Sequence, residues 1–406
     1  MLRRRGRPTT GLSLRPRLQL DVSLLDLLFA LASCVSARRA SREQRVLAAC
    51  GGERDGLVCL SVRSAFDLLL RALALAPGDE IAVSAITHPD MARIIAAHGL
   101  RALPVDLDPA TLAPRTELLE QALGPRTRAV LVAHLFGGLV DLAPLADVAR
   151  RRELLLIEDC AQSLRGHADG GSSAADLSLF SFGSIKRATA LGGCVVRVRD
   201  RGLRERMAAI QSAWPVQSRR EYAARAVKFS ALVLLTRPRS YWVLARTLAA
   251  LGRDFDAVVS GAVRGFPGAD LVGRIRRRPS APLLALLERR LRRFDAERLA
   301  ARIRLAERVA DALPETLFQP GGAALDRTYW VFPVGTSDRT ALISRLRAAG
   351  FDAATATTSI VAIAAPADRA ELAPSAAADL LERIVFLPVY PELDEREVGR
   401  LIAALQ

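Results

Sequence analysis

The chain has 406 residues, half of them hydrophobic and a quarter charged, and carries a formal net charge of +15 at pH 7. This length predicts a large domain with a smaller one, and the composition is that of a globular protein, which excludes a disordered or multi-spanning chain. Arginines spread along the whole chain supply nearly all of the positive charge, and asparagine is absent. Because no basic module interleaved with aromatic residues occurs, we interpret the charge as compositional bias and expect no nucleic-acid partner.

The cysteines are odd in number and form no CxxC pair; they are Cys34, Cys50, Cys59, Cys160 and Cys194. This usage favours a reducing compartment over a disulfide framework or a structural zinc site. We therefore expect a cytoplasmic protein without a bound metal.

Residues 1–56 are predicted to form an N-terminal helical arm. The basic start "MLRRRGR" and the later "LLDLLFALASC" resemble a signal peptide only superficially, because Asp21 and Asp26 interrupt the apolar stretch. An amphipathic first helix is the preferred interpretation. No apolar run reaches the roughly 18 residues of a membrane span.

Residues 57–214 alternate short apolar runs with longer helical ones, which predicts an α/β domain with a mainly parallel sheet wrapped by helices. Strands are predicted at 56–61, 81–86, 101–108, 128–137 and 153–162, and helices at 64–76, 91–99, 115–123 and 142–152.

The composition and the predicted elements change after residue 214. Residues 215–280 show arginine-rich helical segments without clear strands and are predicted to form a helical insertion. Residues 281–406 are predicted to form a small α+β domain preceded by one long helix over 286–313, whose periodicity is continuous.

Chemistry is expected at the carboxyl ends of the parallel strands, where ligands of such sheets bind. The residues at those positions are mostly polar; they are Ser61 to Ser64, Ile86 to His88, His134, Asp159 to Gln162 and the region around Lys186.

Lys186 is one of only two lysines in this arginine-rich chain, the other being Lys228. A lysine amine can lose its proton and attack a carbonyl, whereas a guanidinium stays charged. Asp159 ends the apolar run "LLLIED" 27 residues earlier. A buried acid at that place needs a positive partner, and the protonated ring nitrogen of pyridoxal 5′-phosphate (PLP) is one. An ordinary surface lysine and a helix-capping aspartate are the alternatives.

At this point the sequence resembles the DegT/DnrJ/StrS sugar aminotransferases, PLP enzymes of the aspartate-aminotransferase fold (fold type I). The resemblance covers about residues 57–200 and resumes from about 285. Six segments carry it, namely "PGDEIAVSAITH", "LPVDLDPATL", "RTRAVLVAHLFG", "IEDCAQSLRG", "ADLSLFSFGSIKRATALGGCVV" and "FLPVYPELDEREVGRLI".

The resemblance implies a role for each matched residue. Lys186 would form a Schiff base with PLP and later shuttle a proton, and Asp159 would pair with the ring nitrogen. Gln162 would contact the side of the ring that carries the 3′-oxygen, Ser181 would bind the phosphate, and His88 would stack on the ring unless it is a satisfied buried histidine.

The sequence also departs from the family pattern. Val62 and Arg63 replace a small Gly-Thr pair at the first phosphate loop, where backbone amides and the Arg63 side chain could still hold phosphate, unless Arg63 points to solvent. The family takes an asparagine from the partner subunit, which this chain lacks; the "RRRPS" of residues 276–280 could substitute. Gly183 replaces a bulkier residue, and the substrate loop "ATATTSIVAIAAP" lacks histidine.

The resemblance implies an aminotransferase that moves an amino group, from glutamate, to a nucleotide-linked keto-sugar in cell-surface polysaccharide or amino-sugar biosynthesis, acting as a homodimer. Two alternatives stay open: a PLP enzyme for another carbonyl compound, and a non-catalytic scaffold or regulator. The insertion, with Phe229, Leu235, Tyr241 and Trp242, could cover the active-site mouth, extend a dimer interface, contact an anionic membrane surface or pack as core.

Overall fold

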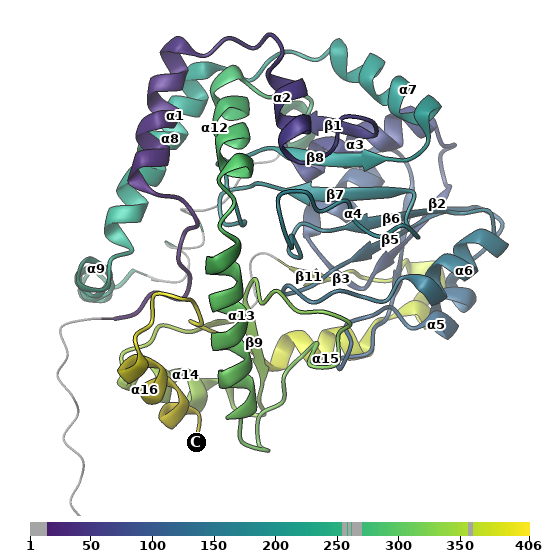
Figure 1. The fold of residues 1–406 in the computed structure, drawn as a ribbon. Helices are drawn as coiled ribbons and strands as arrows, with labels where there is room; N and C mark the ends of the chain where they lie inside the picture. Colours follow the sequence, from purple (N-terminus) through teal and green to yellow (C-terminus); the bar gives the residue numbers. More distant parts are fainter. Residues whose placement is uncertain (1–13, 254–257, 259–260, 262–269, 356–359) are drawn as a thin grey trace, which may run out of the picture.

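The computed structural model describes residues 14–253, 258, 261, 270–355 and 360–406. Its centre is a seven-stranded sheet in the order β1-β8-β7-β6-β5-β2-β4 (Figure 1). Strand β8 pairs antiparallel with both of its neighbours, and the other pairings are parallel. The strands are β1 (Gly56–Cys59), β2 (Glu80–Ser84), β4 (Arg101–Val105), β5 (Thr127–Ala133), β6 (Leu155–Asp159), β7 (Leu177–Ser181) and β8 (Cys194–Val198). The predicted α/β class is confirmed.

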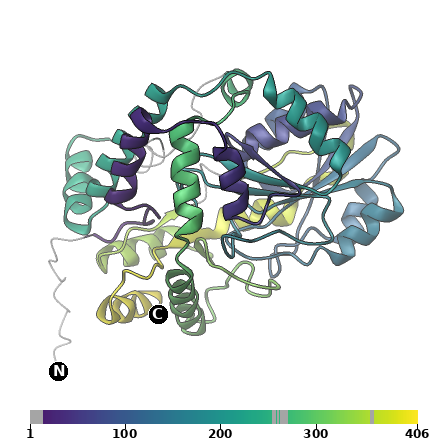
Figure 2. The same cartoon turned by 45° about the horizontal axis from the view of Figure 1, so that its top comes forward.

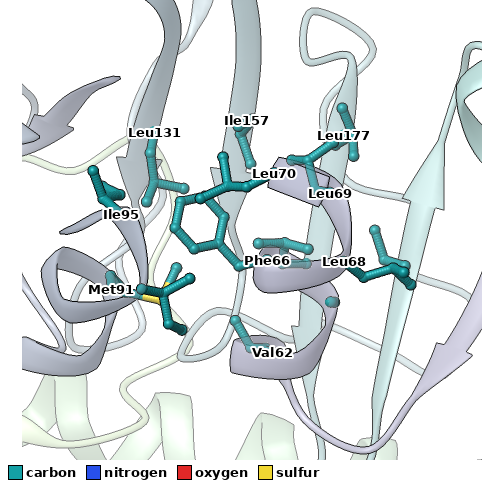
Figure 3. Close-up of a cluster of buried hydrophobic side chains, with 14 of the residues drawn as sticks. Val62, Phe66, Leu68, Leu69, Leu70, Met91, Ile95, Leu131, Ile157 and Leu177 are labelled. Carbon is teal, nitrogen blue, oxygen red and sulfur yellow. The ribbon is translucent and has the colours of Figure 1, made fainter. Parts of the chain in front are cut away.

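Helices connect these strands and cover the sheet: α3 (Val62–Leu73), α4 (Pro89–Ala97), α5 (Thr116–Ala122), α6 (Ala143–Arg151) and α7 (Arg201–Ser212). The largest buried cluster lies between α3, α4 and the sheet. In Figure 3 the ring of Phe66 lies among Leu70, Ile95 and Leu131, and Phe66 is fully buried. Fully apolar runs in the parallel strands follow from coverage on both faces.

The N-terminal arm contains α1 (Leu24–Ser36) and α2 (Arg42–Ala49). The side chain of Ser23 and that of Asp26 form a capping box at the start of α1. Asp26 is buried and accepts hydrogen bonds from Arg289 and Arg290, each at 2.9 Å. These contacts fix α1 on the helix that carries both arginines, α12 (Ala281–Arg292).

The predicted long helix over 286–313 is wrong, because two helices occupy this stretch. Helix α12 ends at Arg292 and α13 (Ala296–Asp311) begins after Asp295, whose carboxylate accepts a 2.8 Å hydrogen bond from the backbone N–H of Arg298. This N-cap explains the break, since an aspartate before a helix satisfies an otherwise unpaired amide. Figure 1 shows the two green helices following one another along the molecule.

Within residues 215–280, the predicted helical insertion, the structure has α8 (Arg219–Leu235), α9 (Pro238–Ala250) and α11 (Leu271–Ile275). Both views place α8 and α9 with α1 at one end of the molecule, and α5 and α6 at the other (Figure 1, Figure 2). Phe229 and Tyr241 are buried, whereas Leu235 is exposed. The Tyr241 hydroxyl donates a 2.7 Å hydrogen bond to Asp352, which ties α9 to the C-terminal part of the chain.

The C-terminal domain holds a small antiparallel sheet in the order β10-β12-β9. Its elements are β9 (Phe332–Gly335), α14 (Arg339–Ala348), β10 (Ala354–Thr355), η1 (Ala367–Leu372), α15 (Ser375–Arg383), β12 (Ile384–Leu387) and α16 (Glu395–Leu405). One further pairing, β11 (Val361–Ala362) with β3 (Ile86–Thr87), joins this domain to the large one. Residues 356–359 of the predicted substrate loop lie outside the described part.

Among the described residues, no helix combines the length and the apolar character that a membrane crossing requires.

Candidate functional site

Asp159 and Lys186 both lie at the carboxyl edge of the parallel strands. Asp159 is the last residue of β6, and Lys186 follows the neighbouring strand β7 in a loop that we call the lysine loop (residues 182–193). The charge of Asp159 acts on the Lys186 amine, and the charge of Lys186 acts on the Asp159 carboxyl. Topology therefore joins two groups that are 27 residues apart in the chain.

The lysine loop is fixed from several sides. The Asp21 carboxylate accepts a 2.6 Å hydrogen bond from the backbone N–H of Ala188, and the Tyr222 hydroxyl donates one of 2.9 Å to the carbonyl of Ala190. Ala188 and Leu191 both adopt left-handed backbone conformations, with φ of 46° and 60°. Such conformations are unfavourable for residues other than glycine, so the contacts of the N-terminal segment and α8 hold the loop in a shape it would not keep alone.

Burial controls the charge state of both groups. It lowers the pKa of Lys186 to about 7, although the Asp159 carboxylate favours the ammonium; the positive charge of Arg63 lowers it further. Burial likewise raises the pKa of Asp159, against a 2.9 Å hydrogen bond from the Ala161 amide and the charge of Lys186. A lysine amine that is neutral near pH 7 can act as a base or a nucleophile.

Trp330 of the C-terminal domain covers Lys186. The Nζ atom of Lys186 lies 3.7 Å from the centroid of the Trp330 ring, and the indole N–H donates a 3.0 Å hydrogen bond to the carbonyl of Ile185. Trp330 is not among the predicted site residues, because nothing in the sequence around it indicates that it faces the lysine.

A cleft opens beside Lys186 and Trp330, and arginines line much of it. Arg187 and Arg302 are among them, and burial lowers their pKa values to about 9 and about 10, with the charge of Arg298 lowering both further. Asp21 and Asp295 offset part of this charge. The cleft therefore remains favourable for anions.

Arg63 points into the site, as one of the two sequence interpretations expects. Its Nε lies 2.8 Å from Asp90 and its Nη2 lies 2.9 Å from Nε2 of His88. Nδ1 of His88 accepts a 3.1 Å hydrogen bond from the backbone N–H of Asp90, as the side chain of a helix N-cap does, and it lies 3.6 Å from the Asp90 carboxylate. Histidine 88 is thus engaged by Arg63 and Asp90 at the start of α4.

The other predicted residues have distinct surroundings. Oε1 of Gln162 accepts a 2.8 Å hydrogen bond from the Phe136 amide, so the NH₂ group of Gln162 points away from that amide. Ser181 is the last residue of β7 and is half-buried. The Val62 side chain belongs to the core (Figure 3), so only its backbone lies where a ligand could be held.

The arginines of "RRRPS" bind elsewhere in the same chain. Arg276 forms two 2.9 Å hydrogen bonds with Asp67, Arg277 pairs with Glu221, and Arg278 donates to the carbonyl of Trp214.

His134, Glu158 and Cys160 form a buried group whose polar atoms lie within 4.8 Å of one another, which raises the question of a metal. Nδ1 of His134 accepts from the Val140 amide, and Nε2 lies 3.0 Å from Glu158. Burial raises the pKa of Glu158, but hydrogen bonds from His134 and Ser178 outweigh it and keep the pKa low. The group is therefore satisfied by protein partners and supports the end of β6.

The donor set matches the functional groups of PLP. An amine that can be neutral suits the aldehyde, a carboxyl suits the ring nitrogen, and hydroxyl, amide and guanidinium groups suit the phenolic oxygen and phosphate. Space is also present: a Cβ at Gly183 would lie 3.4 Å from Ser181 Oγ and 3.7 Å from Lys186 Cγ. The missing side chain therefore leaves the region between these two groups open.

Parts of this chain are similar in sequence to known aminotransferases. Residues 38–230 match the model of the DegT/DnrJ/EryC1/StrS aminotransferase family. GDP-perosamine synthase of Caulobacter vibrioides is 34% identical over 160 residues, which are 38% of this chain and 43% of that protein. The UDP-N-acetyl-3-dehydro-alpha-D-glucosamine 3-aminotransferase of Acidithiobacillus ferrooxidans is 30% identical over 184 residues, 45% of this chain and 50% of that protein. The matches thus span about half the length of these curated relatives.

Solved structures match over a longer stretch. The aminotransferase TlmJ of Streptoalloteichus hindustanus has a TM-score of 0.68 at 22% identity and covers 97% of both chains. NtdA of Bacillus subtilis, solved with the bound cofactor PMP, has a TM-score of 0.68 at 16% identity, over 98% of this chain and 86% of that one. These likenesses establish the fold. Residues 38–230 are thus similar to the DegT/DnrJ/EryC1/StrS aminotransferase family, and the fold of solved aminotransferases extends over nearly the whole chain.

Proposed function

We propose that this protein is a PLP-dependent aminotransferase that transfers an amino group from glutamate to a nucleotide-linked keto-sugar. The observation that carries the proposal is the placement of Lys186 and Asp159 at the carboxyl edge of the sheet, where the charge of each acts on the other and burial lowers the pKa of the lysine to about 7. When bound, PLP supplies an aldehyde that exchanges between amines and a ring that accepts electrons.

Lys186 has two roles in this proposal. Its neutral amine would bind the cofactor. Once released from the cofactor, the amine would carry a proton between a carbon atom of the amino substrate and a carbon atom of the cofactor. An amine with a pKa of about 7 suits both, because it is half neutral at pH 7 and exchanges protons with little driving force in either direction. Trp330 lies over this amine and limits its access to water.

Asp159 would keep the ring nitrogen protonated by supplying a fixed negative charge. The Ala161 amide donates to Oδ1 of Asp159, which holds the carboxyl group in place. A protonated ring nitrogen would in turn stabilise the charged form of Asp159, because a positive partner favours the carboxylate against the effect of burial.

The names of the relatives support the substrate class. The two proteins quoted above are named for sugars linked to GDP and UDP. The arginine-lined cleft beside Lys186 supports it independently, since guanidinium groups bind diphosphates in two-pronged contacts.

We further propose that the protein is a cytoplasmic homodimer. The five cysteines are free thiols, which suits a reducing compartment. Leu25, Leu28 and Val35 of α1 are exposed apolar side chains that a second copy could cover. Size-exclusion chromatography with light scattering tests the dimer.

The enzymatic proposal is tested by incubating the protein with PLP, glutamate and a panel of nucleotide-linked keto-sugars, while 2-oxoglutarate is measured. Without a keto-sugar we expect 2-oxoglutarate to form only in the first turnover, and with a keto-sugar we expect it to keep forming. Lys186→Ala should abolish this formation. Failure with every sugar, although PLP is bound, would move the assignment to another carbonyl substrate.

A further inference from the structure

Helix α8 of the insertion brings a second arginine to the lysine loop. Its buried face consists of Tyr222, Ala226 and Phe229, which pack in one cluster with Phe180 and Phe182 of the strand and loop that lead to Lys186. Arg225 lies one residue before Ala226 and shares this orientation. The helix therefore presents one cationic side chain toward the loop among apolar ones.

Arg225 contacts the loop directly. Its Nη2 atom lies 3.3 Å from the Oγ atom of Ser184, a buried residue two positions before Lys186 and three after Ser181. The neighbouring contact from Tyr222 to the Ala190 carbonyl, at 2.9 Å, fixes the same helix face on the same loop. Two side chains of α8, Arg225 and Tyr222, thus hold this helix face on the lysine loop.

Arg225 and Arg63 lie close enough for their charges to interact. Burial is the main reason why the pKa of Arg225 is lowered, and the charge of Arg63 adds to it. Arg63 lies in the first turn of α3, where it contacts Asp90 and His88, and its positive charge also acts on Lys186. Two guanidinium groups that converge on a partly buried hydroxyl-lined loop favour an anion of more than one negative charge, such as a phosphate monoester.

We propose that Arg225 and Arg63 together bind the phosphate of PLP, so that the insertion helix completes the cofactor site from within the same chain. The inference rests on the proposed function, because the aldehyde end of the same cofactor must reach Lys186. The phosphate then lies near Ser181 and Ser184, on the loop that carries the lysine, as the length of one small cofactor requires.

The test compares two ligands that differ only in the phosphate. PLP and pyridoxal are titrated into the cofactor-free protein, and quenching of tryptophan fluorescence gives each dissociation constant. Arg225→Gln is expected to weaken PLP about 10- to 100-fold and pyridoxal less than about 3-fold, because a charged hydrogen-bond partner of the phosphate is lost. Arg225→Lys keeps the charge but loses the two-pronged contact, and a smaller loss confined to PLP is expected.

Arg220→Gln is the matched control, because Arg220 is an exposed arginine on the same helix and its removal changes the net charge equally. It is expected to bind both ligands like the unaltered chain. An equal loss of PLP and pyridoxal in both Arg225 variants would assign Arg225 to helix packing and overturn the inference, as would unchanged binding of both. If the unaltered chain bound no PLP at all, the proposed function itself would fall, together with this inference.

Discussion

Replacing Lys186 by methionine should stabilise the cofactor-free protein near neutral pH. The pKa of Lys186 falls from an ordinary value of 10.5 to about 7 in the folded protein, mainly because of burial. At about 1.4 kcal/mol per pH unit, the folded state disfavours the ammonium by up to about 5 kcal/mol relative to the unfolded state. Methionine keeps the length of the side chain and removes the titrating group.

The gain should be smaller than this limit for two reasons. The Lys186 side chain is only partly buried, so water reduces the penalty, and Asp159 loses the favourable charge of the ammonium. We therefore expect Lys186→Met to raise the free energy of unfolding by about 2–4 kcal/mol at pH 7.

The pH dependence has a defined sign. The pKa of this amine is lower in the folded state, so the unfolded state binds more protons between pH 7 and 10.5, and the destabilisation fades as pH rises through that window. Below pH 7 the difference between the variant and the unaltered chain should stay constant.

Urea unfolding of both cofactor-free proteins, followed by circular dichroism at pH 6, 7, 8.5 and 10, measures this difference. A variant that is less stable than the unaltered chain at pH 7, or whose gain is the same at pH 10, would refute the argument that burial keeps the lysine amine neutral.

Three further substitutions test the packing around the site. Phe66→Ala should lower the free energy of unfolding by about 3–5 kcal/mol in urea, because the ring is fully buried between α3 and the sheet. Asp26→Ala should lower the thermal midpoint at pH 7 by removing the cap of α1 and the two 2.9 Å contacts from α12, with a cost of about 3 kcal/mol; its effect should vanish in acid, where the carboxyl protonates as pH falls through its lowered pKa. Tyr241→Phe should cost about 1–3 kcal/mol in urea, because Asp352 loses a 2.7 Å hydrogen bond, and a change below about 0.5 kcal/mol would contradict that contact.

The order of strands and helices in the large domain could be predicted from the sequence, because buried parallel strands are short apolar runs between amphipathic helices. The same reasoning indicated Asp159 and Lys186, since both follow such strands. The break before α13 was harder to predict, because the apolar periodicity continues through Phe294 and the capping by Asp295 involves a single residue.

Contacts between distant segments left no local signal. Trp330 reaches Lys186 only because the C-terminal domain packs against the lysine loop. Arg225 is one arginine among many in the insertion, and what distinguishes it is its position three residues after Tyr222, on the buried face of α8. In a chain so rich in arginine, burial distinguishes a site residue from a surface residue, and burial requires the fold.

The covalent attachment of the cofactor to Lys186 is tested most directly by borohydride reduction. The protein is incubated with PLP, reduced, digested and examined by mass spectrometry. Only two lysines can carry the label, and Lys228 is exposed on α8 and serves as an internal control. We expect stoichiometric labelling of Lys186 with little on Lys228. Equal labelling of the two lysines, or none on Lys186, would contradict the account.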